Sequence, residues 1–264
     1  MVALATDAAF HVIPFQKSES FKLYRECVFF SIFSRDYLIE ILSVGWYIFL
    51  MVITWLGQAC FKIQSSDLVV VVDPFSKDIG LTPPRFRADV VLVTHSHYDH
   101  ANAESLTGEP FVVTGAGEYE TKGISVRGIE TFHDAVQGRE RGMNTVYRIE
   151  VENTSILHMG DFGEPEMRAG TLDEAGDIDI LMIPVGGKYT IDASEAAKIV
   201  KQIEPKIVIP MHYKIPGLKV ALEGVEAFLK EMGASKAEPQ EKLTIKKKDI
   251  AEHKGGGVAL LKVS

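Results

Sequence analysis

The chain has 264 residues, of which 46% are hydrophobic and 24% are charged, a composition that suits one large globular domain or two small ones and excludes a disordered chain. Its formal net charge of −8 repels phosphate backbones, so we do not expect it to bind nucleic acid. The basic run from Lys246 to Lys248 is typical of a solvated edge. Cys27 and Cys60 form no CxxC pair, which favours a reducing compartment, and we expect a cytoplasmic protein.

The first fifty residues differ in character from the rest. Residues 38–56 read LIEILSVGWYIFLMVITWL and are almost wholly apolar, close to the length of a membrane span. However, Glu40 lies inside this window, no basic cluster flanks it, and the N-terminus lacks a basic signal region, so a membrane anchor is the minority alternative. We expect residues 1–50 to be a helical extension or the product of an over-called start codon, and residues 51–264 to form the compact domain.

Short strands follow from Met51 onward. The segment MVITWLGQACFKIQSSDLVVVVDPF predicts three consecutive strands with turns at Gly57-Gln58 and at 65–67. Further runs rich in Val and Ile predict strands at 89–94, 124–130, 145–151, 154–159, 178–183 and 206–210. The segment GAGEYE at 115–120 lacks the third glycine of a dinucleotide loop, so we expect a simple turn there.

Helical signals lie between and after these strands. A helix is expected to begin near His100 and to run through 101–106. In TIDASEAAKIVKQIE, Asp192 is a candidate N-cap and Glu195 its capping-box partner, and an apolar stripe follows. The segment LKVALEGVEAFLKEMG predicts a helix that ends at Gly233. Strands first and then strands alternating with helices predict an α+β fold of two packed sheets with helices outside.

The heptapeptide THSHYDH at 94–100 carries the chemistry. Three imidazoles and a carboxylate stand where an apolar strand ends, so their side chains can converge above the edge of a sheet. His95 and His97 can serve one metal ion, and Asp99 and His100 a second. More donors are required, because a catalytic zinc typically takes three protein ligands and a water.

Three later residues are candidates for the missing ligands, because each follows a predicted strand: His133, Asp161 and His212. A carboxylate such as Asp161 can bridge two cations, which a neutral imidazole cannot do. His158 is interpreted as a core histidine rather than a ligand, and His11 and His253 as surface residues.

HSHYDH resembles the HxHxDH signature of the metallo-beta-lactamase fold superfamily, and the three later candidates match its ligand positions in chain order. ITWLGQACFKI, VDP, PVGGKYTIDASEA and IPMHY are similar to the small metal-dependent hydrolases that include the ascorbate-6-phosphate lactonase type, so the resemblance covers residues 51 to about 262. It implies a four-layer αββα sandwich. It also implies a first site of His95, His97, His133 and Asp161, and a second of Asp99, His100, Asp161 and His212.

The function that this resemblance implies is hydrolysis at two divalent ions. Zinc is the expected metal and manganese the alternative. A hydroxide between the ions would attack a small ester, lactone, amide or phosphoester, and Asp99 would carry a proton to the leaving group. Asp73 is expected either to orient a ligating imidazole or to be a turn residue before Pro74.

A small, anionic substrate is expected, because only about fifty residues separate Asp161 from His212, too few for a large inserted recognition domain. Arg139, Arg141 and Lys188 are candidates to neutralise its phosphate or carboxylate, and ordinary surface charges are the alternative for all three.

Two other classes of function stay open. The first is di-iron oxidoreduction on the same fold, although the family concerned places Glu where His97 stands and adds a flavin domain. The second is a non-catalytic metal or ligand-binding module, which the complete ligand set disfavours. Oligomeric state is not indicated by the sequence.

Overall fold

The computed structural model describes residues 50–246, 250 and 255–264. Apart from Leu50, which begins a strand, the expected N-terminal extension lies outside these residues, as do Cys27, His11 and His253. Residues 50–56 of the apolar window belong to a strand, while residues 38–49 lie outside the described part. Within the described residues, no helix combines the length and the apolarity needed to cross a bilayer. The domain boundary at residue 51 stays a prediction.

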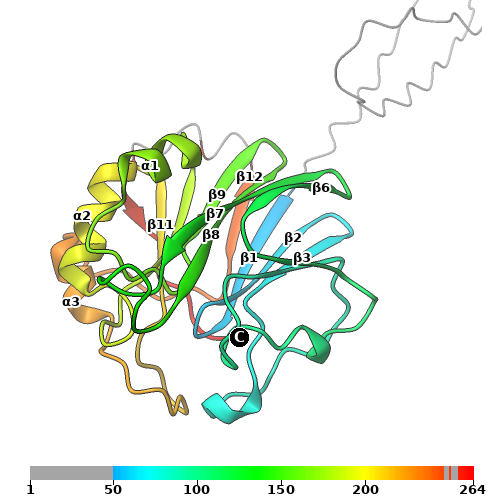
Figure 1. Ribbon diagram of the computed structural model, residues 1–264, viewed down its shortest axis with the longest axis horizontal. Helices are drawn as coiled ribbons and strands as arrows, with labels where there is room; N and C mark the ends of the chain where they lie inside the picture. The colour runs from blue at the N-terminus through cyan, green and yellow to red at the C-terminus, as the bar shows by residue number, and fades with distance from the viewer. Residues whose placement is uncertain (1–49, 247–249, 251–254) are drawn as a thin grey trace, which may run out of the picture. The chain divides into compact units, whose positions relative to one another are not determined.

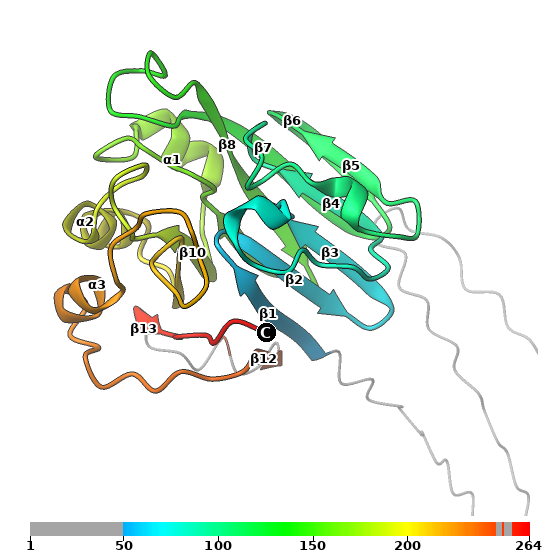
Figure 2. The same ribbon diagram turned by 90° about the horizontal axis from the view of Figure 1, so that it is seen from below.

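The first sheet has six strands in the order β12-β1-β2-β3-β4-β5 (Figures 1 and 2). Its strands are β1 (Leu50–Gly57), β2 (Cys60–Ser65), β3 (Leu68–Val72), β4 (Val90–Val93), β5 (Phe111–Thr114) and β12 (Leu243–Lys246). β1, β2 and β3 form an antiparallel meander, and β4 and β5 continue the sheet in parallel. The predicted three-strand meander and its turns are confirmed.

The second sheet has seven strands in the order β13-β11-β10-β9-β8-β7-β6. Its strands are β6 (Gly117–Thr121), β7 (Ile124–Phe132), β8 (Met143–Val151), β9 (Thr154–His158), β10 (Ile180–Pro184), β11 (Ile207–Met211) and β13 (Gly257–Val258). The simple turn expected at 115–120 is wrong, because β6 pairs with β7 through a hairpin. Lys122 and Gly123 both have positive φ, the geometry that a two-residue hairpin turn requires.

Three short helices lie on the outer side of the second sheet: α1 (Ala169–Ala175), α2 (Ala193–Ile203) and α3 (Glu226–Glu231) (Figure 2). The predicted capping box of α2 is present, since Asp192 accepts from the Glu195 backbone and the Glu195 side chain accepts from the Asp192 backbone.

Two helix predictions are wrong in extent. The helix that ends at Gly233 contains only Glu226–Glu231, because residues 218–225 form a loop tied by backbone hydrogen bonds from Lys219 to Ile79 and from Glu223 to Gly186. The helix expected through 101–106 is a single 3-10 turn, η2 (Ala103–Ser105). There the backbone N–H of Asn102 donates to Pro74, which holds the chain against the loop after β3.

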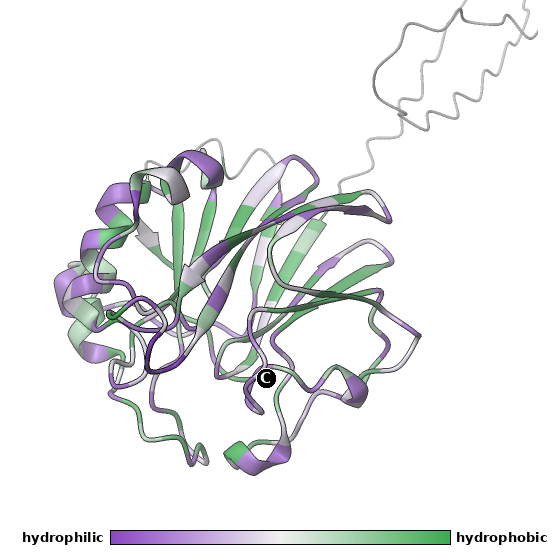
Figure 3. Ribbon diagram, viewed as in Figure 1, coloured by the Kyte–Doolittle hydropathy of each residue, from purple (hydrophilic) through white to green (hydrophobic). Residues whose placement is uncertain are grey.

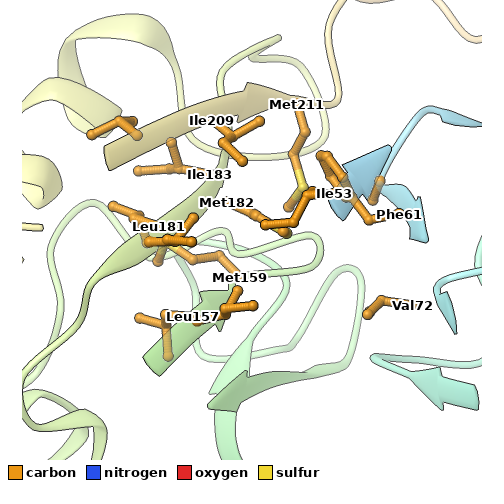
Figure 4. Close-up of a cluster of buried hydrophobic side chains, with 14 of the residues drawn as sticks. Ile53, Phe61, Val72, Leu157, Met159, Leu181, Met182, Ile183, Ile209 and Met211 are labelled. Carbon is orange, nitrogen blue, oxygen red and sulfur yellow. The ribbon is translucent and has the colours of Figure 1, made fainter. Parts of the chain in front are cut away.

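The main core lies between the two sheets. Figure 4 shows side chains from the first sheet meeting those of the second, with Ile53 close to Met211. Full burial of a side chain such as Phe61, which is 0% exposed, contributes about 1.5–3 kcal/mol. Hydrophobic residues follow the strands of both sheets, and hydrophilic ones gather on the helices and surface loops (Figure 3).

A smaller core covers the outer face of the first sheet. It packs Cys60, Val71 and Val91 of the sheet against Phe75 and Ile79 of the loop with the 3-10 turn η1 (Lys77–Ile79). The order of layers is therefore that of an αββα sandwich, with 3-10 turns and loops as the outer layer on this side. The thiol of Cys60 is buried in this smaller core, and burial raises the pKa of that thiol.

Candidate metal centre

The seven predicted ligands follow the carboxyl ends of four strands. Residues 95–100 follow β4, His133 follows β7, Asp161 comes shortly after β9, and His212 follows β11. β7, β9 and β11 run in the same direction within the second sheet, so their carboxyl ends lie at one edge. The loop after β4 meets that edge from the first sheet.

The structure gathers these side chains into two groups whose ligand atoms lie within 4.8 Å of one another. The first ligand group is His95, His97 and His133, and the second is Asp99, His100, Asp161 and His212. The division of the heptapeptide between two groups follows the predicted pairing of His95 with His97 and of Asp99 with His100.

Asp161 stands between the two ligand groups, and each of its oxygens faces one of them. Its Oδ2 lies 3.3 Å from Nε2 of His133 and 4.0 Å from Nε2 of His95. Its Oδ1 lies 3.3 Å from Nε2 of His100 and 3.2 Å from Nε2 of His212. This is the placement required of a carboxylate that bridges two cations.

The donor atoms fit cations. The side-chain atoms Nε2 of His95, Nε2 of His100 and Oδ1 of Asp161 are buried and have no hydrogen-bond partner among the described residues, a rare condition for polar atoms in a folded protein. Imidazole nitrogens and carboxylate oxygens are the usual ligands of zinc. A cation at each group would supply the missing partner for these atoms.

The two ligand groups differ in protonation in the metal-free chain. Burial disfavours the imidazolium form of His100, but Asp161 and Asp73 raise the pKa of His100 well above its ordinary value. Burial and the neighbouring His100 lower the pKa of His95 to about 3, which leaves the His95 ring neutral and its electron pair available to a metal. Burial also opposes the charged form of Asp99, yet its hydrogen bond to His100 and the charge of His100 lower the pKa of Asp99 to about 2.

Asp73 orients His100. Oδ2 of the fully buried Asp73 accepts from Nδ1 of His100 at 2.9 Å and from the Thr94 hydroxyl at 2.8 Å, and Oδ1 accepts from the Thr94 backbone N–H at 2.8 Å. In the neutral ring that a cation requires, the proton stays on Nδ1 beside Asp73 and leaves Nε2 of His100 unprotonated and facing the second ligand group. Of the two interpretations of Asp73, the geometry agrees with the orienting one.

His158 is placed as a core residue. It is fully buried, its Nε2 lies 2.8 Å from the Ala59 carbonyl, and its Nδ1 accepts from the Gly160 backbone N–H at 3.1 Å. Both ring nitrogens are therefore occupied, and burial lowers the pKa of His158, which keeps the ring neutral.

Gln58 reaches the second ligand group, although the sequence marks it only as a turn residue. Its side-chain nitrogen lies 3.0 Å from Oδ2 of Asp99 and 2.9 Å from Nε2 of His212. Sequence reasoning missed it because a residue of the β1–β2 turn contacts Asp99 and His212 only after the two sheets have packed.

A pocket of about 410 Å³ opens over both groups. Besides ligand candidates it is lined by Tyr98, Tyr189, Arg141, Lys219, Val220 and Ala221. The Arg141 guanidinium lies over the Tyr189 ring at 4.8 Å, a cation–π contact that fixes its position. Of the predicted substrate-binding cations Arg139, Arg141 and Lys188, only Arg141 lines this pocket, and the loop that replaces the expected helix adds Lys219.

Asp134 shapes the loop that carries Arg141. Oδ1 of Asp134 accepts from the backbone N–H groups of Val136 and Gly138, and Oδ2 from those of Glu140 and Arg141. Desolvation opposes ionisation, but these four bonds hold the pKa of Asp134 below its ordinary value. A single acidic residue thus organises the chain between His133 and Arg141.

The family model described as "Beta-lactamase superfamily domain" matches residues 52–212. The chain belongs to this superfamily. A relative from Methanopyrus kandleri, named UPF0173 metal-dependent hydrolase, is 28% identical over 215 residues, which cover 69% of this chain and 93% of that one.

Solved structures agree with this assignment. A candidate zinc-dependent hydrolase of the metallo-beta-lactamase superfamily from Thermotoga maritima superposes with a TM-score of 0.67 and 33% identity over 81% of this chain and 100% of that one. A diiron beta-hydroxylase from Streptomyces venezuelae superposes with a TM-score of 0.54 at 15% identity, over 80% of this chain and 53% of that one, which shows likeness of fold alone. The predictions of superfamily, fold and enzyme class are confirmed.

Proposed function

We propose that this chain is a hydrolase that holds two divalent cations and cleaves a small anionic ester, lactone, amide or phosphoester. The observation that carries the proposal is the placement of Asp161, whose two oxygens face different ligand groups. The names of the relatives support a metal-dependent hydrolase. We propose in addition that it holds two ions, that these are zinc or manganese, and that its substrate is lactonase-like.

The residues of the first ligand group, together with Oδ2 of Asp161, would hold one ion, and those of the second group, with Oδ1 of Asp161, the other. Zinc is the first choice for such imidazole and carboxylate donors and manganese the alternative. When bound, the two cations would lower the pKa of water and polarise the substrate oxygen.

Asp99 is the proposed proton carrier. It lines the pocket, and its pKa, lowered to about 2, keeps the carboxylate ionised. It would take the proton of the attacking water and pass it to the leaving oxygen or nitrogen as the substrate bond breaks.

Arg141 and Lys219 are proposed to select an anionic substrate. Both line the pocket that contains His97, His133 and His212, so a phosphate or carboxylate bound by them would place its neighbouring bond near the ligand groups. A volume of about 410 Å³ suits a small molecule rather than a polymer. We also propose a cytoplasmic location, which rests on the cysteine usage and the buried free thiol of Cys60.

The proposal is tested by an activity screen across lactones, phosphodiesters and thioesters, each with a neutral and an anionic member, in the presence of zinc or manganese. Hydrolysis of an anionic member that requires added metal is expected. Two bound irons with redox activity, or no metal-dependent hydrolysis in any class, would contradict the proposal.

A further inference from the structure

Gln58 has a backbone that is fixed from two sides. Its carbonyl oxygen accepts from the Trp55 indole N–H at 3.0 Å and from the His212 backbone N–H at 3.1 Å. Its φ of +52° lies in the left-handed region, which the turn between β1 and β2 imposes. The residue is 0% exposed, and its side chain points toward the second ligand group.

The side-chain amide of Gln58 is only half satisfied. Its nitrogen contacts Oδ2 of Asp99 and Nε2 of His212, whereas its oxygen is buried and finds no partner in the part of the chain that the structure describes. The two ends of an amide have nearly the same shape, and a half-turn about the last side-chain bond exchanges them. The amide can therefore present either N–H groups or an oxygen to the same two neighbours.

The position of that amide atom is one that a metal ligand would occupy. Two donors on adjacent corners of an octahedral ion, each about 2.1 Å from it, lie about 3.0 Å apart. The amide atom of Gln58 lies 3.0 and 2.9 Å from the predicted ligand atoms of Asp99 and His212, which matches this spacing. A cation between those two atoms would repel the amide N–H groups and attract the amide oxygen.

We propose that Gln58 is a fifth protein ligand of the ion at the second ligand group, bound through its side-chain oxygen. We propose that it shifts the metal preference of this group from zinc toward manganese. The inference rests on the proposed two-metal function. The first group then offers three imidazoles and one shared carboxylate oxygen, whereas the second offers two imidazoles and three oxygens. Oxygen donors suit manganese and imidazoles suit zinc, so the two groups are chemically unlike.

The test compares the metal affinities of the full chain carrying Gln58→Leu with those of the wild type. Chelator-treated protein is titrated with manganese alone and with zinc alone, and the bound ions are counted by calorimetry and by the electron paramagnetic resonance of free manganese. We expect the affinity of one manganese to fall about tenfold or more, the zinc affinity to fall less, and the other ion to bind as before.

Gln64→Leu is the control, because Gln64 lies on the neighbouring strand β2 and its amide nitrogen donates to the Ser66 carbonyl, away from the ligand groups. Gln58→Asn is the second variant. It keeps an amide but shortens the side chain by one carbon, which withdraws the oxygen, and it should lose manganese affinity as Gln58→Leu does. Cobalt loading supplies an independent readout, since removal of a ligand should intensify the visible absorption of the cobalt at this group.

Manganese affinity and cobalt absorption that are the same in Gln58→Leu, Gln58→Asn and the wild type would overturn the assignment of Gln58 while leaving the two-metal site intact. A wild-type chain that binds only one ion would instead overturn the proposed function, and the Gln58 assignment with it.

Discussion

Replacing Asp73 by Asn should disable the second ligand group without removing any ligand. Oδ2 of Asp73 accepts the Nδ1 proton of His100, and Oδ1 accepts the Thr94 backbone N–H. An Asn that keeps its oxygen on Thr94 presents N–H groups to His100, so the imidazole must move its proton to Nε2. That nitrogen faces Asp161 and would then have no electron pair for a metal.

The magnitude follows from the bond that is lost. A hydrogen bond to a charged group contributes about 1.5–3 kcal/mol, which corresponds to about 10- to 150-fold in affinity. We expect Asp73→Asn to lower the affinity for one of the two metal ions by this factor. The affinity for the other ion should change by no more than about twofold. Metal titration of chelator-treated protein measures both affinities, and nitrogen NMR of the imidazole reports the tautomer of His100.

Asp89→Asn is the matched control for Asp73→Asn. Asp89 is also a buried carboxylate in the first sheet, but it stands at the opposite end of β4, where it accepts from Val69, Arg87 and Lys122. Its replacement should lower thermal stability and leave both metal affinities unchanged. The reasoning is refuted if Asp73→Asn folds and binds both ions as tightly as Asp89→Asn does.

Three further predictions concern the pocket and the ligand groups. Asp161→Ala removes an oxygen from both groups, so elemental analysis should find both ions depleted and turnover abolished; full turnover would exclude the bridging role. Arg141→Gln should raise KM for an anionic substrate about tenfold or more with kcat little changed, and Arg139→Gln, outside the pocket lining, should change neither. His95 has a pKa lowered from 6.5 to about 3, so the unfolded chain binds more protons than the folded chain between these values. The unfolding free energy of metal-free protein should therefore fall from pH 6.5 toward pH 3, by up to about 1.4 kcal/mol per pH unit, and fall less in His95→Gln; equal slopes would contradict the assignment.

The ligand groups could be predicted because each ligand follows a strand whose apolar pattern is visible in the sequence. The heptapeptide holds four of them within six positions, and the direction of the strands brings the other three to the same edge. The capping box of α2 is equally local, since Asp192 and Glu195 stand three positions apart.

The positions that escaped prediction depend on partners distant in sequence. Gln58 meets Asp99 and His212 across 41 and 154 positions, and no local pattern encodes such contacts. Lys219 reaches the pocket because its segment is a loop bonded to Ile79 instead of the helix that its composition favours. Propensity was overridden by tertiary hydrogen bonds there, as it was in the turn at 101–106.

The central claim is that Asp161 lies between two cations, and anomalous diffraction from crystals of the metal-loaded chain tests it most directly. Data collected on either side of the absorption edge of the loaded metal locate each ion without reference to activity. The account predicts two peaks, one beside each carboxylate oxygen of Asp161, with His133 at the first and His212 at the second. A single peak, or two peaks that Asp161 does not touch, would contradict it.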